Sequence, residues 1–143
     1  GRVGQVLTWL GEELWLSGEL SLRREGSVVL RVFLCPEKGG DRWVAIPREE
    51  RSIWVLRADR AVQDMGWPGV ELPAQGKQLR RLEHGRAAIV TQGDGVQTWE
   101  GMARFALFRT EKTVALVLEL EAGGSRLALV GEEVPRELVQ EMG

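Results

Sequence analysis

The stretch that decides the fold runs from Gln78 to Gly131 and reads QLRRLEHGRAAIVTQGDGVQTWEGMARFALFRTEKTVALVLELEAGGSRLALVG. Its apolar runs lie at residues 87–90, 105–108, 114–120 and 127–130, with turn signals at 92–95 and 123–124 between them. Short apolar runs between glycine-rich breaks are typical of β-strands joined by hairpin turns. The stretch therefore predicts antiparallel β-structure.

The first part of the chain shows the same pattern. Strands are predicted at residues 20–22, 27–35, 42–46 and 52–56, with a charged hairpin turn at 23–26. In the second part they are predicted at 78–83, 86–91, 97–109, 113–121 and 125–131. Pro135 suits either the first turn of a short terminal helix or an extended tail. Together these segments predict an all-β fold.

Residues 61–75 differ in composition from the segments on either side. Gly66, Pro68, Gly69 and Pro73 fall here, and proline removes a donor that a strand needs, so no regular strand is expected. We interpret the segment as a Gly/Pro-rich connection with one helical turn at 59–65, held to the fold by Trp67. The prediction is a single all-β domain, 1–143, with halves 1–60 and 76–143.

The two halves resemble each other in sequence. Residues 28–34 align with 103–109, and residues 52–56 align with 125–129, at offsets of 75 and 73 residues. Strand meanders resemble one another by default, so a duplicated unit and a chance likeness both stay open. A duplication would predict two sequential antiparallel β units packed face to face, as a sandwich or a partly open barrel.

Composition narrows the classes of function. A net charge of -2 gives no general attraction to nucleic acid, and carboxylates such as Glu12 and Glu25 are interleaved with the arginines that would form a basic face. No apolar run reaches the ~20 residues needed to span a bilayer, so a cytoplasmic location is expected. The single Cys35 excludes an internal disulfide and is expected to be a small buried side chain.

Groups that could perform catalysis are few. His84 is the only histidine, and with Glu83 it could form an acid/base pair, but Glu83 to Gly85 is better interpreted as a hairpin turn. Glu119 alternates with apolar neighbours and is expected on the solvent-facing side of a strand. One His and one Cys argue against a metal site, although a site built only from carboxylates stays open. No cofactor is expected, and an enzyme is less favoured than a binding protein.

The aromatic residues carry the leading hypothesis. Tyrosine is absent while tryptophan occurs six times; Trp43, Trp67 and Trp99 are predicted to be exposed anchors, and Trp9 and Trp15 to lie in the core. The leading hypothesis is a non-enzymatic binding or protein-interaction module, with homodimerisation compatible. The alternative is a small-molecule binder or enzyme with a cavity between the halves, in which Glu119, Glu83 or His84 supplies polar groups.

Glycines and apolar residues carry a family resemblance. The residues that carry it are Val3-Gly4-Gln5-Val6 followed by Leu16-Ser17-Gly18-Glu19-Leu20, then Gly76, Leu79, Leu82, Glu83, Gly85 and Ala87, and later Glu119 and Gly131. In these residues the chain resembles the bacterial domain-of-unknown-function family numbered four-one-seven-eight. The chain departs from the family's aromatic positions at Val28 or Val29, Leu79 and Phe105. The resemblance implies an all-β domain with no established catalytic activity, accessory to a bacterial stress or membrane-associated system. It carries over no functional residues.

Overall fold

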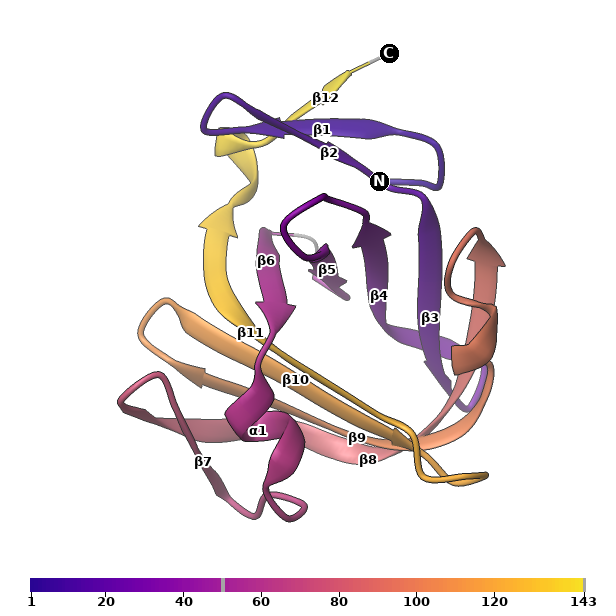
Figure 1. The fold of residues 1–143 in the computed structure, drawn as a ribbon, viewed down its shortest axis with the longest axis vertical. Helices are drawn as coiled ribbons and strands as arrows, with labels where there is room; N and C mark the ends of the chain where they lie inside the picture. The colour runs from indigo at the N-terminus through magenta and orange to yellow at the C-terminus, as the bar shows by residue number, and fades with distance from the viewer. Residues whose placement is uncertain (50, 143) are drawn as a thin grey trace.

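A computed structural model describes residues 1–49 and 51–142, and almost all of its regular structure is β (Figure 1). The strands are β1 (Val6–Trp9), β2 (Glu12–Trp15), β3 (Gly18–Arg24), β4 (Ser27–Cys35), β5 (Arg42–Pro47), β6 (Ser52–Ala58), β7 (Glu71–Ala74), β8 (Lys77–Gly93), β9 (Gly101–Thr110), β10 (Thr113–Leu120), β11 (Arg126–Pro135) and β12 (Gln140–Met142). The helical elements are α1 (Arg60–Asp64) and the 3₁₀ turns η1 (Gln97–Trp99) and η2 (Arg136–Leu138). The prediction of an all-β fold is confirmed.

Two four-stranded meanders close into one antiparallel barrel. The order around the barrel is β3-β4-β5-β6-β11-β10-β9-β8, so each meander keeps its strands together. The last strands of the meanders pair along a β6–β11 seam, and the first strands pair along a β3–β8 seam. The two sequential antiparallel units predicted from the sequence are therefore present. They form a closed barrel, whereas the sequence predicted either a sandwich or a partly open barrel.

Apolar side chains from both meanders fill the interior of the barrel. Successive residues of a strand point to opposite faces of a sheet, so Trp43 and Ala45 of β5 point inward while Val44 and Ile46 pack on the outside. Both faces of β5 are covered, and its sequence therefore lacks the polar alternation that marks a solvent-facing side. The prediction that Trp43 is exposed is wrong for this reason, because the residue is 7% exposed inside the barrel.

A three-stranded sheet, in the order β12-β1-β2, covers the outside of β4, β5 and β6 and lies at the top of Figure 1. Leu7 and Leu14 form its buried face and pack with Phe33. Trp15 follows Leu14 in the strand, points to the opposite face and is 49% exposed, so the prediction that it lies in the core is wrong. Trp9 is half-buried against the same apolar cluster.

The connection between the meanders forms a second outer layer, over β9, β10 and β11. Asp59 caps α1 by accepting a hydrogen bond from the Val62 backbone N–H at 3.0 Å, which confirms the helical turn predicted at 59–65. Val62 is fully buried and packs with Leu72 of β7. The expectation of no regular strand here is wrong for β7. Its Pro73 is tolerated because β7 is an edge strand that pairs only with β8.

Two further predictions of local structure are corrected. Residues 77–93 form the single strand β8, so Glu83 to Gly85 is not a hairpin turn. The strand continues because its first part pairs with β7, its middle with β9 and its end with β3. Residues 97–99 form the 3₁₀ turn η1 rather than the start of a strand, and β9 begins at Gly101.

Candidate functional site

A cleft of about 300 Å³ opens at one end of the barrel, where strands of the two meanders face each other. We call it the mouth cleft. It is lined by Val29, Pro47, Arg48, Glu49, Arg51, Ser52, Trp54, Leu82, Glu83, Leu107 and Arg109. These residues come from β4, β5, β6 and the turn before it in the first meander, and from β8 and β9 in the second.

A polar layer lies beside the mouth cleft at the end of the apolar interior. Glu133 of β11 is directly paired with Trp54 of β6, so both side chains lie on the same, inward face of the sheet. The Arg109 guanidinium donates through Nη2 to Oε2 of Glu133. The Ser52 hydroxyl donates to the same oxygen at 3.1 Å. The layer thus joins β6, β9 and β11 around one carboxylate.

Two N–H donors of this layer are left without an acceptor. Within residues 1–49 and 51–142, neither Trp54 Nε1 nor Arg109 Nε has a hydrogen-bond partner, and both atoms are buried. Trp54 as a whole is only 2% exposed. A buried donor without an acceptor costs about 1–3 kcal/mol, so such a group calls for an explanation. Both unpartnered groups belong to residues that line the mouth cleft.

The rim of the mouth cleft is basic and partly apolar. Arg48 donates through Nε to the Val28 carbonyl at 3.2 Å, and among the described residues neither Arg48 nor Arg51 forms an ion pair. Leu82 is the extra residue of a β-bulge, because β8 pairs Arg81 and Glu83 with consecutive residues of β9. A bulge redirects a side chain, and here it places a leucine that is 53% exposed at the cleft.

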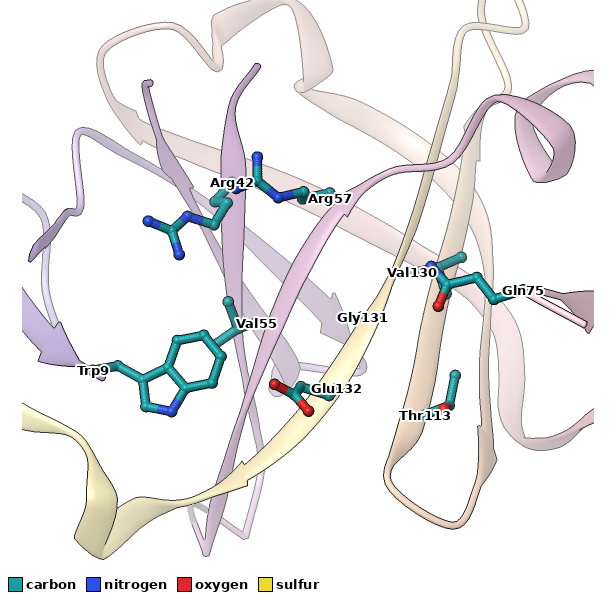
Figure 2. Close-up of a pocket in the computed structure, with 9 residues that line it drawn as sticks. All are labelled: Trp9, Arg42, Val55, Arg57, Gln75, Thr113, Val130, Gly131 and Glu132. Atoms are coloured by element: carbon teal, nitrogen blue, oxygen red, sulfur yellow. The ribbon is translucent and has the colours of Figure 1, made fainter. Parts of the chain in front are cut away.

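A second recess, of about 370 Å³, lies on the outside of the barrel between the two outer layers. We call it the furrow. Figure 2 shows Trp9 of β1 on one side, Gln75 on the other, and Glu132 of β11 between them. The remaining lining residues are Arg42, Val55, Arg57, Thr113, Val130 and Gly131.

The two arginines of the furrow are already paired with carboxylates. Arg42 donates to both Glu12 and Glu37, each at 2.5 Å, and Arg57 lies 3.7 Å from Glu37. Burial lowers the pKa of Arg42, but the hydrogen bonds to Glu12 and Glu37 outweigh it, and the pKa is raised overall. Arg42 and Arg57 are directly opposed on β5 and β6, so the carboxylates also offset a like-charge contact. Arg42 and Arg57 therefore belong to a structural ion-pair cluster.

The comparison with protein families matches residues 2–136 to the family described as domain of unknown function, DUF4178. The match spans the whole barrel and both outer layers except for β12. The chain belongs to the DUF4178 family. No match was found among curated proteins or among solved structures.

Glu119, one of the positions that carried the resemblance to DUF4178, lies in an ion-pair cluster on β10. It accepts hydrogen bonds from Arg104 at 2.6 Å and from Arg126 at 3.0 Å. Burial raises the pKa of the Glu119 carboxyl, but the hydrogen bonds from the two arginines outweigh it and the pKa falls below its usual value. The cluster lies away from the mouth cleft, whose lining does not include Glu119.

Trp67 stacks on the same cluster in this DUF4178 protein. The centroid of its ring lies 4.1 Å from the guanidinium carbon of Arg104 and 5.8 Å from that of Arg126. Arg126 also donates to the Met65 carbonyl, just after α1. Trp67 is half-buried and holds the connection against the barrel, as the sequence predicted, so the prediction that it is exposed is wrong. The structure does not bring it together with Trp43, Trp99 or His84.

Trp99 and His84 occupy two further regions of the fold. Trp99 was predicted to be exposed, but it is half-buried against the barrel interior, next to the fully buried Val96, at the end opposite the mouth cleft. Gly95 packs closely at that end, because a methyl group on it would lie 2.8 Å from the side chain of Leu34 at the end of β4. His84 is exposed in the middle of β8, paired with Ala106.

Neighbouring Glu83 is the one predicted polar group that lines the mouth cleft, and it lies 3.7 Å from Arg24. Cys35 is buried as predicted, and burial raises the pKa of its thiol to about 12 despite the opposing charge of Arg42. In the part of the chain that the structure describes, no three His, Cys, Asp or Glu residues are grouped to hold a metal ion. No helix there is long and apolar enough to cross a membrane.

Sequence reasoning missed the two residues that define the mouth cleft. Phe105, Leu107 and Arg109 alternate along β9 and all point inward, so an arginine stands in phase with two core residues. This alternation was the signal in the sequence that could have identified Arg109, since a charged residue at an inward position needs a buried partner. Trp54 gave no such signal, because tryptophan within an apolar strand is ordinary core.

Proposed function

We propose that this member of the DUF4178 family is a non-enzymatic binding module whose ligand site is the mouth cleft. The observation that carries the proposal is the pair of buried donors, Trp54 Nε1 and Arg109 Nε, without acceptors in the described residues. A ligand that supplies an acceptor recovers the free energy that these unpaired groups cost. The cleft also places apolar side chains beside polar and charged ones, and polar groups at fixed positions give a ligand site its specificity.

The groups around the mouth cleft favour binding over catalysis. Its lining holds three arginines and the carboxylates Glu49 and Glu83, with no histidine or cysteine among the described lining residues. General acid–base work near neutral pH needs a group whose pKa lies near the working pH. Arginine stays protonated there, and its use is to hold anionic or acceptor groups. The arginine-rich lining therefore supports a binding function, and it also supports the alternative of a small-molecule site between the two β units.

Native mass spectrometry of the protein, purified untagged from a bacterial host, tests the proposal. We expect a reproducible mass excess over the bare chain, and we expect Trp54→Phe combined with Arg109→Lys to remove it. The matched control is Arg57→Lys with Trp9→Phe, which changes the same residue types in the furrow. An excess that survives the cleft variant and is lost in the furrow variant would contradict the proposal, as would a bare chain in every preparation.

A second candidate function, contact with a protein partner, rests on a separate surface. Met142, Val6 and Trp15 are directly paired across β12, β1 and β2, so they form one row on the outer face of the three-stranded sheet. Met142 is 46% exposed and Trp15 49%. Exposed tryptophan and methionine in one row are typical of interface surfaces. If this candidate function is correct, we expect the protein to act in the cytoplasm, in an accessory role in a bacterial stress or membrane-associated system.

Site-specific photo-crosslinking in bacterial cells tests this second candidate. A photoreactive residue in place of Trp15 should give one discrete crosslinked product, and the same residue in place of Glu25, on the exposed β3–β4 turn, should not. A product at twice the mass of the chain would identify a second copy as the partner. Equal smears from both positions would show that the row is ordinary surface.

A further inference from the structure

The geometry points to a carboxylate joined to a short apolar group as the ligand class of the mouth cleft. This inference rests on the proposed function and deepens it by naming what the cleft selects. Among the described residues, the buried side-chain atoms without a hydrogen-bond partner are two N–H groups, and both belong to residues that line this cleft. Unpaired donors require an acceptor from the ligand, so the matching ligand group carries oxygen acceptors and no proton of its own.

The charge at the cleft favours an ionised acceptor over a neutral one. Arg109 shares one carboxylate, Glu133, with Ser52, and its Nε is a buried donor that has no acceptor in the described residues. Arg48 and Arg51 add two positive charges at the rim. Hydrogen bonds to a charged group are about twice as strong as neutral ones, and a carboxylate offers two oxygens to two donors. A ligand carboxylate therefore matches the chemistry of the two donors, Trp54 Nε1 and Arg109 Nε.

The remaining lining limits what the carboxylate is attached to. Val29, Pro47 and Leu107 form apolar walls, and Leu82 of the bulge stands half out of the surface beside them. Glu49 and Glu83 also line the cleft, so a second negative charge on the ligand would be repelled. A cleft of about 300 Å³ holds a small ligand rather than a folded chain. A monoanion with a short apolar tail satisfies all of these features.

Entry to the donors requires a local rearrangement at the cleft. Trp54 Nε1 and Arg109 Nε are buried from solvent, so an acceptor must displace side chains that cover them. Leu82 is suited to move, because an extra residue in a strand is not fixed by cross-strand pairing and its side chain is half exposed. Binding is therefore expected to change the environment of the Trp54 indole directly.

Nuclear magnetic resonance with ¹⁵N-labelled tryptophan provides the test, using hexanoate, hexanamide and inorganic phosphate as probes. Each of the six indole N–H groups gives its own signal, and Trp54→Phe identifies the one from Trp54. We expect hexanoate to shift this signal downfield with saturation, hexanamide to bind at least about tenfold more weakly, and phosphate to leave it unchanged. The tenfold difference reflects loss of a charged hydrogen bond.

Two conservative variants locate the effect. Arg109→Lys keeps the positive charge and a partner for Glu133 but removes the Nε donor, and it should weaken hexanoate by about tenfold. Arg86→Lys is the matched control, because Arg86 is exposed on the same meander and pairs with Glu121 outside the cleft. It should leave hexanoate binding unchanged.

The outcomes separate this inference from the proposed function. Equal binding of hexanoate and hexanamide, or stronger binding of phosphate, overturns the carboxylate class while the cleft remains a ligand site. No shift with any probe also overturns the carboxylate class, and the mass-spectrometric experiment then decides the proposed function by itself. The comparison of probes on the unmodified protein stands even if a variant fails to fold.

Discussion

At the scale of single residues, Gly131 decides whether the barrel can close. It faces Leu56 across the β6–β11 seam, and a methyl group on it would lie 1.9 Å from the Val55 carbonyl oxygen. The obstacle is backbone, which cannot give way without opening the seam. We predict that Gly131→Ala lowers the free energy of unfolding by about 3 kcal/mol or more. Urea unfolding followed by tryptophan fluorescence measures the change.

A glycine in open space provides the control for this prediction. Nothing lies within 4 Å of a methyl group placed on Gly66, and its backbone is not in the left-handed region. Gly66→Ala should therefore change stability by less than about 0.5 kcal/mol. If the two variants were equally stable, the β6–β11 seam would be able to accommodate a methyl group at residue 131. The close approach of the two backbones there would then not be needed for the barrel to close.

The sequence predicted the interior at this scale only where alternation was visible. Leu20 and Leu22 alternate with polar residues, and both are fully buried. Trp43 and Trp15 were assigned to the wrong environments, because β5 is covered on both faces and β2 is covered on one. Which face of a short strand is covered depends on an outer layer contributed by distant parts of the chain, and no local pattern reports that.

At the scale of elements, the cluster of Glu119, Arg104 and Arg126 holds α1 and the following connection to the sheet. Glu119→Gln keeps the shape but removes the charge that both arginines need, and Trp67 stacks on the arginines that remain. We predict a loss of about 1–2 kcal/mol near neutral pH. Faster hydrogen exchange at α1 than at β9 would show that the loss is local.

The pH dependence of this difference follows from the lowered pKa of Glu119. A carboxyl with a lower pKa in the folded state stabilises the fold above its unfolded pKa, near 4.5, and the contribution is lost as the pH falls through the folded value. The gap between the unmodified protein and Glu119→Gln should therefore be full at about pH 6 and shrink toward zero in strong acid. A gap that stayed constant with pH would mean that the glutamate acts through packing alone.

The strand β8 shows where local signals end. Glu83, His84 and Gly85 are acceptable in a turn, and nothing in them forbids an extended strand either. The choice is made by pairing, since one edge of β8 meets β7 and then β3 while the other meets β9. By contrast, β4 was predicted with its observed bounds, because charged and glycine-containing turns mark both of its ends.

At the scale of the whole molecule, the sequence likeness of the two halves corresponds to a likeness of position. Residues 28–34 and 103–109 lie in β4 and β9, the second strands of their meanders, and residues 52–56 and 125–129 lie in or next to β6 and β11, the last strands. Duplication of one unit stays a prediction. The closure of the barrel could not be predicted, because the residues that pair across the two seams lie 65 or more residues apart in the chain.

The interior implies that the halves fold as one unit. Of the 22 residues in the interior cluster, ten come from the first meander and twelve from the second, so neither meander can form this interior by itself. We predict that residues 1–60 and 76–143, expressed separately, give the narrow amide spectra of unfolded chains. Expressed together, they should restore the dispersed spectrum, because both seams can form between chains. An intact chain with a flexible insertion at Gly69 is the control, and a dispersed spectrum from either half alone would show two independent domains.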